Sequence, residues 1–375
     1  KIIGDLILNY GIKREFRINE LTRALDQLFP KLEGDKVTFI GTTFIRHGET
    51  RPYLNHCIVL NSCSEPRDVE NCVIEEYETE KEVLLAWQKV IMRENPDIIL
   101  GYNIFGFDYD FMYQRAVENR CVEQFLKLSK NKGEICGAKD PFSKTNKEYQ
   151  INKSSIVIAS GQHDLNYIKM NGRIQVDLYN HFRRDFNLSS YKLDYVSGYF
   201  IGDKAKKIEH SDGKTIVYSS NLAGLNVGAY IHFEESSHTT EYYKDGGKFM
   251  VTKIEKGRFE IDTVEEPDMT KSVRWCLAKD DVTPQDIFRL TDEGPDERAI
   301  VAKYCIQDCN LVHELFNKID IMTGFIEMAT ICSVPMSFLV LRGQGIKLTS
   351  FIAKKCRENG TVIPVIEKKN TDDGY

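Results

Sequence analysis

A short apolar run between two helical segments constrains the fold of this chain more than any other feature. The run is Asp-Ile-Ile-Leu-Gly at residues 97–101. Residues 80–94 repeat apolar side chains at helical spacing, Pro96 ends that segment, and residues 107–119 again favour a helix. An apolar run without polar alternation indicates a strand buried on both faces, as in the sheet of an α/β protein.

The rest of the chain predicts further elements around this strand. Residues 1–35 favour helix, with apolar residues at helical spacing and Asn19 as a start cap. A hairpin is expected from residues 36–46 and 56–60, and a strand from residues 172–179. Residues 130–161 are polar and rich in Gly, Ser and Lys, which favours a loop. A long helix is expected at about 295–317, followed by further helices to residue 359.

Residues 203–284 differ in composition from the flanking segments and predict a small β module inserted between helical parts. Strands are expected at 227–234, 248–253 and 258–264, separated by Gly-containing turns. The basic run Lys204-Ala205-Lys206-Lys207 within it is interpreted as a solvated loop.

Composition limits the class of protein. The 375 residues are 42% hydrophobic and 28% charged, typical of a soluble globular protein with sizeable cores. Neither a signal peptide nor a membrane-spanning run is recognisable. Ten Cys without a CxxC spacing favour free thiols and an intracellular, non-secreted protein, with Cys305 and Cys309 as buried small hydrophobes on one helix face. The net charge of −6 neither indicates nor excludes a nucleic-acid binder.

The strongest chemical signal is Gly-Tyr-Asn-Ile-Phe-Gly-Phe-Asp at residues 101–108, where the buried strand ends and a helix begins. Ligand sites of open α/β sheets lie outside strand ends, so Asp108 is a candidate site residue. A plain helix cap is the equally weighted alternative for Asp108, with Asn103 as a turn residue.

A second acid lies in Tyr-Cys-Ile-Gln-Asp at residues 304–308. Tyr304 and Asp308 are four residues apart and share a helix face, so the phenol could orient a water beside the carboxylate. Phosphodiester hydrolysis commonly uses two divalent cations held by carboxylates. Asp108 and Asp308 together are too few for both ions, and a surface Tyr/Asp pair is the simpler interpretation of the spacing alone.

Four segments in order resemble motifs of B-family DNA polymerases. Tyr-Asn-Ile-x-x-Phe-Asp, ending at Asp108, resembles the Exo II motif, and Tyr-Cys-x-x-Asp, ending at Asp308, resembles Exo III. Residues 188–193, Leu-Ser-Ser-Tyr-Lys-Leu, resemble the Leu-x-Ser-Tyr-x-Leu segment, and residues 342–344 resemble Arg-Gly-Gln. The resemblance is closest to delta-type replicative polymerases, and the insertion and N-terminal stretch resemble elaborations in polymerases of large DNA viruses.

The resemblance implies a ribonuclease-H-like fold, a mixed sheet flanked by helices, that hydrolyses mispaired 3′ ends in the 3′→5′ direction. It implies that Asp108 and Asp308 ligate two Mg²⁺ or Mn²⁺ ions and that Tyr304 orients the nucleophilic water. Asn103 and Phe107 would touch the single-stranded primer end of a primer-template. The implied setting is a monomer without membrane association, in the nucleus or at a viral replication site, with a processivity factor as a partner of the full-length polymerase.

These expectations divide the chain into five parts. They are an N-terminal helical stretch (1–35), a first exonuclease part with Exo II (36–202), the inserted β module (203–284), a second exonuclease part with Exo III (285–332), and a helical connection toward a polymerase palm (333–375).

The family's Exo I motif, Asp-Ile-Glu on a first strand, is not recognisable. Asp68-Val69-Glu70 matches the letters but favours a polar loop. The acids Glu75, Glu76, Glu78 and Glu80 are interpreted as a solvated face. Exo I is expected to precede Lys1, and the polymerase motifs to follow Tyr375. This chain alone is therefore expected not to polymerise and to hydrolyse DNA poorly.

Two alternatives remain open. Residues 46–50, Arg-His-Gly-Glu-Thr, resemble the signature of histidine phosphatases, in which His47 would be the nucleophile and Arg46 would bind phosphate. A polar hairpin turn centred on Gly48 is the favoured interpretation. The second alternative is a DNA-binding or scaffold domain of the same fold that has lost the metal site.

Overall fold

The computed structural model describes residues 11, 13–28, 33–67, 69–139, 149–158, 161–278 and 282–363. They fall into two compact units, residues 1–36 and residues 37–375. The first unit contains helix α2 (Arg14–Leu28). Asn19 lies inside α2, so the prediction that it caps the helix was wrong. The helix begins earlier, at Arg14-Glu15, where Glu15 in the first turn interacts favourably with the helix dipole.

The second unit begins with a three-stranded sheet of order β1-β2-β3, with strands β1 (Phe39–Phe44), β2 (Leu54–Leu60) and β3 (Cys72–Tyr77). Strands β1 and β2 are antiparallel, which confirms the predicted hairpin, and β3 is parallel to β2. Helix α3 (Glu80–Glu94) follows, and its start is fixed by a capping box between Thr79 and Glu82.

The apolar run at residues 97–101 forms strand β4 (Ile98–Gly101), which pairs in parallel with β7 (Ile174–Asp177). Ile99 packs on the hydrophobic cluster of α3 and α4, whereas Ile98 and Leu100 pack on a second cluster that includes α6 and α9. The strand therefore lies between two layers, as its composition predicts. Its C-terminal end leads into a π-helical turn, η1 (Ile104–Asp108), and helix α4 (Tyr109–Glu118).

A hairpin of β5 (Asn152–Ile158) and β6 (Gly161–Tyr167) lies where a loop was predicted for residues 130–161. The prediction was wrong at this point because β5 begins with Asn-Lys-Ser-Ser, which gives no apolar alternation. Strand β6 contacts η1, and the Tyr167 ring lies 6.1 Å from the Phe105 ring. Residues 140–148 of the expected loop lie outside the described residues.

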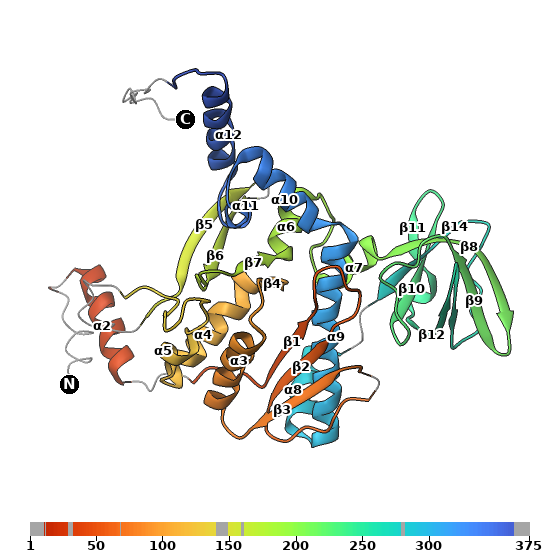
Figure 1. Cartoon of the computed structure of the whole chain (residues 1–375). Coiled ribbons are helices and arrows are strands. Elements are labelled where there is room, and N and C mark those ends of the chain that lie inside the picture. Colours follow the sequence, from red (N-terminus) through yellow and green to blue (C-terminus); the bar gives the residue numbers. More distant parts are fainter. Residues whose placement is uncertain are drawn as a thin grey trace. The chain divides into compact units, whose positions relative to one another are not determined.

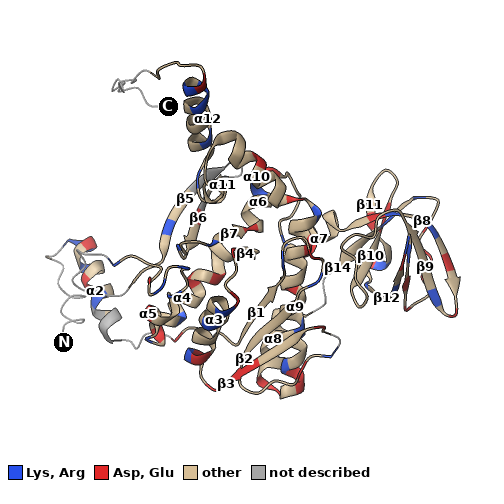
Figure 2. Ribbon diagram, viewed as in Figure 1, with Lys and Arg blue, Asp and Glu red and all other residues tan. Residues whose placement is uncertain are grey.

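Helices make up most of the remaining second unit. Their bounds are α5 (Val122–Phe125), α6 (Leu178–Asp185), α7 (Leu193–Phe200), α8 (Pro284–Asp292), α9 (Pro295–Lys318), α10 (Ile321–Cys332), α11 (Met336–Leu341) and α12 (Gln344–Glu358). Helix α9 contacts both β1 and β4, so it connects the two sheets (Figure 1). Basic residues recur in α12 (Figure 2). Among the described helices, none is long and apolar enough to cross a membrane.

Residues 202–278, which overlap the segment predicted to be an inserted β module, form a closed antiparallel β-barrel. Its strands are β8 (Gly202–Ser211), β9 (Lys214–Ser219), β10 (Tyr230–Ser236), β12 (Phe249–Glu255), β13 (Arg258–Ile261) and β14 (Ser272–Ala278). The ring runs β10-β12-β13-β9-β8-β14 and closes where β14 pairs with β10, while β11 (Thr240–Tyr242) pairs only with β10. The closing contacts are short, because β8 pairs with β14 only at residues 202–204 and β12 pairs with β10 only at Phe249 and Met250.

The barrel interior is filled by the inward-facing apolar residue of each strand. Fully buried examples are Val217, Ile231, Phe233, Val251, Phe259 and Trp275. The Trp275 indole N–H donates to Ser219 Oγ at 2.9 Å, which satisfies the one polar atom of the ring inside the barrel.

The basic run of residues 204–207 was predicted as a loop but belongs to β8. Ala205 is buried whereas Lys204, Lys206 and Lys207 are exposed, and β8 has a bulge against β9 between Ala205 and Lys207. The bulge interrupts the alternation, so the strand signal is lost from the sequence.

Candidate active site

The turn after β4 is organised by a buried carboxylate on the neighbouring strand. Asp177 ends β7, is 1% exposed, and pairs in register with Gly101 at the end of β4. Its Oδ1 accepts the backbone N–H of Asn103 at 2.7 Å and of Tyr179 at 3.0 Å, and its Oδ2 accepts the N–H of Phe105 at 3.0 Å. Asp177 thus caps helix α6 and holds the π-helical turn with one side chain.

Two glycines allow this turn to close. A Cβ on Gly106 would lie 2.3 Å from Asn103 Oδ1, and a Cβ on Gly101 would lie 2.2 Å from Ile104 Cγ2. Asn103 itself adopts the left-handed conformation, with φ of 64°. π-Helical turns occur often at functional sites because they displace the following side chains from their helical positions.

Asp108 is the last residue of the turn and does not act as a helix cap. Its backbone is helical, and its side chain makes no capping hydrogen bond to α4, so the cap alternative was wrong. The side chain is half-buried, and burial raises the pKa of Asp108 to about 6. Burial also raises the pKa of Asp177 to about 6, against the three amide hydrogen bonds, and the nearby Asp108 charge adds to the rise.

Asp308 and Tyr304 lie one turn apart on α9, both half-buried. Burial raises the pKa of the Cys309 thiol, and negative charge on Cys305, Asp308 and Asp108 raises it further. Helix α9 also contacts β4, the strand that leads into the Asp108 turn, so Asp108 and Asp308 both lie near Cys309 although they are 200 residues apart in sequence.

Close packing of β1 fixes α9 at this point. A Cβ on Gly41 of β1 would lie 3.2 Å from backbone and side-chain atoms of Cys305. Cys305 and Cys309 face this packed region, as predicted from their spacing, although each is half-buried rather than fully buried. The helix that carries Tyr304 and Asp308 is therefore seated directly against the first sheet.

The predicted primer-contacting residues also lie at this turn. Phe107 is 57% exposed, and its ring stacks on Phe111 with centroids 5.3 Å apart and an interplanar angle of 13°. Asn103 is half-buried. An exposed, stacked aromatic pair next to carboxylates is a surface on which a nucleic-acid base can stack. Contact with a primer end remains a prediction.

The donor set fits a hard divalent cation but is incomplete. Carboxylate oxygens such as those of Asp108 and Asp308 are the ligands that Mg²⁺ and Mn²⁺ prefer. Three backbone N–H groups use most of the acceptor sites of Asp177, so we assign it the role of holding the turn. Within the described residues, β1 pairs only with β2, and β4 pairs only with β7, so each has an unpaired edge.

The four upstream glutamates were predicted to form a solvated face, and two of them do not. Glu75 lies 3.0 Å from the buried His56 ring, and Glu80 is buried. Glu76 accepts the Cys63 N–H at 2.7 Å. Asp68, in the Asp-x-Glu match, lies outside the described residues.

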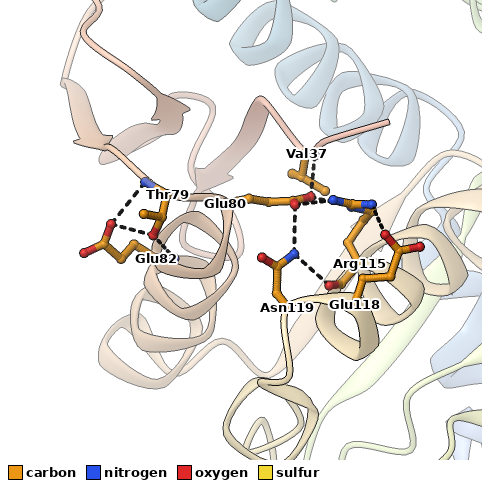
Figure 3. A network of polar contacts seen from close by, with 7 residues as sticks. All are labelled: Val37, Thr79, Glu80, Glu82, Arg115, Glu118 and Asn119. Atoms are coloured by element: carbon orange, nitrogen blue, oxygen red, sulfur yellow. Dashed lines mark hydrogen bonds and ion pairs between the residues drawn. The ribbon is translucent and has the colours of Figure 1, made fainter. Parts of the chain in front are cut away.

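Figure 3 shows how Glu80 anchors helix α4, which begins next to Asp108. Its carboxylate accepts Arg115 Nε at 2.7 Å and Nη2 at 2.5 Å, Val37 N at 2.8 Å and Asn119 Nδ2 at 2.8 Å. Arg115 also pairs with Glu118. The network ties α4 to the start of α3 and to the chain entering β1.

The Arg-His-Gly segment is an exposed turn between β1 and β2, with φ of +87° at Gly48. The Arg46 guanidinium lies over the Tyr53 ring, 5.1 Å from its centroid. Burial lowers the pKa of His313 on α9, and the His47 charge lowers it further. The turn itself agrees with the favoured hairpin interpretation.

Asp177 is the site residue that the sequence analysis missed. It ends the predicted strand 172–179, and the carboxyl ends of neighbouring parallel strands meet at one sheet edge. Pairing of β7 with β4 could have been predicted from two short apolar runs that each lead into a helix. That signal would have placed Asp177 beside Asp108.

Comparison with known proteins connects this geometry to a family. Residues 18–196 match the model of "DNA polymerase family B, exonuclease domain". The DNA polymerase of Phaeocystis pouchetii virus is 46% identical over 100% of this chain, and that of Pyramimonas orientalis virus is 37% identical over 93%. The DNA polymerase delta catalytic subunit of Glycine max is 25% identical over 92%. The matches cover 36%, 26% and 24% of these relatives, so the chain spans about a third of their length or less.

Proposed function

Because this chain belongs to the B-family DNA polymerases, with residues 18–196 matching the exonuclease domain, we propose that it is the proofreading region of such an enzyme. In the intact polymerase this region hydrolyses the mispaired 3′ end of a primer in the 3′→5′ direction. The observation that supports the proposal is the contact of α9, which carries Asp308, with β4, whose following turn carries the exposed Phe107 and Asp108.

The side chains divide the work as follows. Asp108 and Asp308 would hold divalent cations through their carboxylates, and Asp177 fixes the turn that presents Asp108. Magnesium or manganese bound there supplies an activated hydroxide and stabilises the leaving oxygen. Tyr304, one helical turn before Asp308, orients the attacking water. Phe107 stacks on the terminal base, supported from behind by Phe111.

Ionisation of Asp108 limits this chemistry. Because burial raises its pKa to about 6, part of the population is protonated in slightly acidic solution and cannot ligate a cation. A bound cation stabilises the carboxylate form, so cation binding at neutral pH keeps Asp108 ionised.

Two carboxylates hold two cations poorly, so the intact site needs further acids. The unpaired edges of β1 and β4, both in contact with α9, mark where one more strand of the polymerase would extend the sheet beside Asp108 and Asp308. We propose that acids on a strand at these edges complete the cation site of the intact polymerase. This chain by itself is therefore expected to hydrolyse single-stranded DNA weakly.

Calorimetric titration with Mn²⁺ tests the proposal. The chain should bind Mn²⁺, and Asp108→Asn and Asp308→Asn should each weaken binding at least about tenfold, the loss typical of altered metal ligation. Asp110→Asn, two residues after Asp108 on α4 and with its carboxylate 3.8 Å from Lys153 Nζ, is the matched control and should bind like the parent chain. Equal Mn²⁺ affinity in the parent chain and Asp108→Asn would refute the assignment.

The inactive-scaffold alternative predicts no carboxylate-dependent Mn²⁺ binding, so the same titration separates the two. A phosphatase would require turnover of a phosphomonoester that His47→Ala abolishes, and we expect none.

The relatives are polymerases of viruses and of a plant, so we place the intact enzyme in a nucleus or at a viral replication site, acting on primer-template DNA with a processivity factor. The isolated chain is proposed to be a monomer.

A further inference from the structure

Three side chains of types that can ligate a metal lie on the outside of the barrel, where β10 pairs with β14. His232 and Glu234 lie two residues apart on β10, and Cys276 of β14 is the cross-strand partner of His232. The intervening Phe233 and neighbouring Trp275 point into the barrel and are fully buried. Because side chains alternate along a strand, the three face the same outer side.

The spacing of the three side chains suits one ion. One nitrogen, one oxygen and one sulfur atom from the three residues all lie within 4.8 Å of one another. His232 Nε2 is 3.8 Å from Glu234 Oε1. Ligands of tetrahedral zinc, at about 2.0–2.3 Å from the metal, are about 3.3–3.7 Å apart, so small side-chain rotations complete the geometry.

His232 Nε2 is a buried nitrogen without a hydrogen-bond partner among the described residues. A buried polar atom of this kind costs free energy unless a partner or an ion satisfies it. Its ring is held edge-on against Tyr242, with centroids 5.3 Å apart. Cys276 is fully buried, belongs to no disulfide, and interacts through its thiol with the Glu234 carboxylate, which places the sulfur beside a second candidate ligand.

Helix α7 closes the other side of the cluster. A Cβ on Gly198 would lie 3.6 Å from His232 Cε1 and 3.7 Å from the Cys276 Cβ. Arg274 Nη2 donates to the carbonyls of Gly198 and Tyr199 at 3.2 and 2.6 Å, and its Nη1 lies 3.4 Å from Glu234 Oε2. The arginine thus orients one oxygen of Glu234 and leaves the other toward His232, as outer residues do around ligating carboxylates.

We propose that His232, Glu234 and Cys276 bind a Zn²⁺ ion beside α7. The ion links β10 to β14, the strand pair that closes the barrel. Imidazole, thiolate and carboxylate together suit zinc, whereas the all-carboxylate pair Asp108 and Asp308 suits magnesium or manganese. A water molecule completes the coordination. The site is independent of the proposed nuclease chemistry, since its ligands come entirely from the inserted barrel.

Cobalt substitution of the whole 375-residue chain tests the site, because Co²⁺ bound by a thiolate gives a near-ultraviolet charge-transfer band. We expect the band and about one equivalent of retained zinc in the parent chain. Cys276→Ser should abolish the band, and His232→Gln should weaken zinc binding about tenfold or more. Zinc should raise the melting temperature of the parent chain but not of Cys276→Ser, since a ligand stabilises only the state that binds it.

The control is Cys309→Ser, which removes the thiol close to Asp108 and Asp308 and should keep the band. Circular dichroism verifies that each variant is folded. The proposal is wrong if zinc affinity is the same in folded Cys276→Ser and the parent chain. It is also wrong if Asp308→Asn or Cys309→Ser, rather than Cys276→Ser, removes the cobalt band.

Discussion

Replacing Glu80 with Ala should destabilise the second unit far more than any surface substitution would. The Glu80 and Arg115 side chains are 5% and 3% exposed, and four donors point at the Glu80 carboxylate (Figure 3). Removing one partner of a buried ion pair costs about 3–5 kcal/mol, because the other charge stays buried and uncompensated. Arg115 keeps Glu118, which is 41% exposed, so we expect the lower end, about 3 kcal/mol.

The pH dependence of this effect has a definite sign. Burial favours the neutral form of Glu80, but hydrogen bonds from Arg115, Val37 and Asn119 outweigh it and lower the pKa of Glu80. The stabilisation is therefore complete above the pKa of Glu in the unfolded chain, about 4.3, and is lost as the pH falls through the lower folded value. The difference between the parent chain and Glu80→Ala should shrink in acid.

Urea unfolding followed by tryptophan fluorescence measures the effect. The chain has two Trp residues, Trp87 in α3 and Trp275 in the barrel, so a Trp275→Phe background leaves Trp87 as the reporter. With m-values of about 1–3 kcal/mol/M, a loss of about 3 kcal/mol lowers the midpoint by about 1–3 M.

Glu82→Ala is the matched control in the same turn of α3. Glu82 is exposed and completes the capping box with Thr79, so its loss should cost only about 0.5–1 kcal/mol. A loss below about 1 kcal/mol for Glu80→Ala, indistinguishable from the control, would show that the ion pair does not anchor α4 as described.

Further predictions concern three residues of the site, Asp108, Asp177 and Phe107. Mn²⁺ affinity should fall as the pH drops through about 6, where Asp108 becomes protonated, and Asp108→Asn should raise the melting temperature at pH 7 because it removes a charge disfavoured by burial. Asp177→Asn should cost about 1–3 kcal/mol in urea unfolding, since one acceptor becomes a donor that faces a backbone N–H such as that of Phe105. Mn²⁺ titration of that variant should also show weaker binding, and unchanged stability and affinity would contradict the role of Asp177. Phe107→Ala should weaken binding of a single-stranded oligonucleotide by about 1–3 kcal/mol in fluorescence anisotropy, whereas Phe288→Ala, an equally exposed phenylalanine on α8, should not.

The sequence predicted the parts of the fold whose signals are local. The β4 run, the hairpin of β1 and β2, and the Tyr304–Asp308 spacing on α9 each depend on neighbours within a few residues. Asp108 was predicted as a site residue for the same reason, because the turn that it ends follows the strand.

What was missed depends on partners distant in the chain. Glu80 is buried only because Arg115, 35 residues later, neutralises it. Asp177 acts through amides more than 70 residues earlier. Strand β8 of the barrel has a bulge and polar outward residues, so its pairing with β9 and β14, rather than its own periodicity, decides its conformation.

The first and last strands of the barrel are neighbours, with Gly202 of β8 opposite Cys276 of β14. The inserted segment therefore leaves and re-enters the host at points one cross-strand pair apart, about 5 Å between Cα atoms. Such an insertion imposes no separation on the helices that flank it.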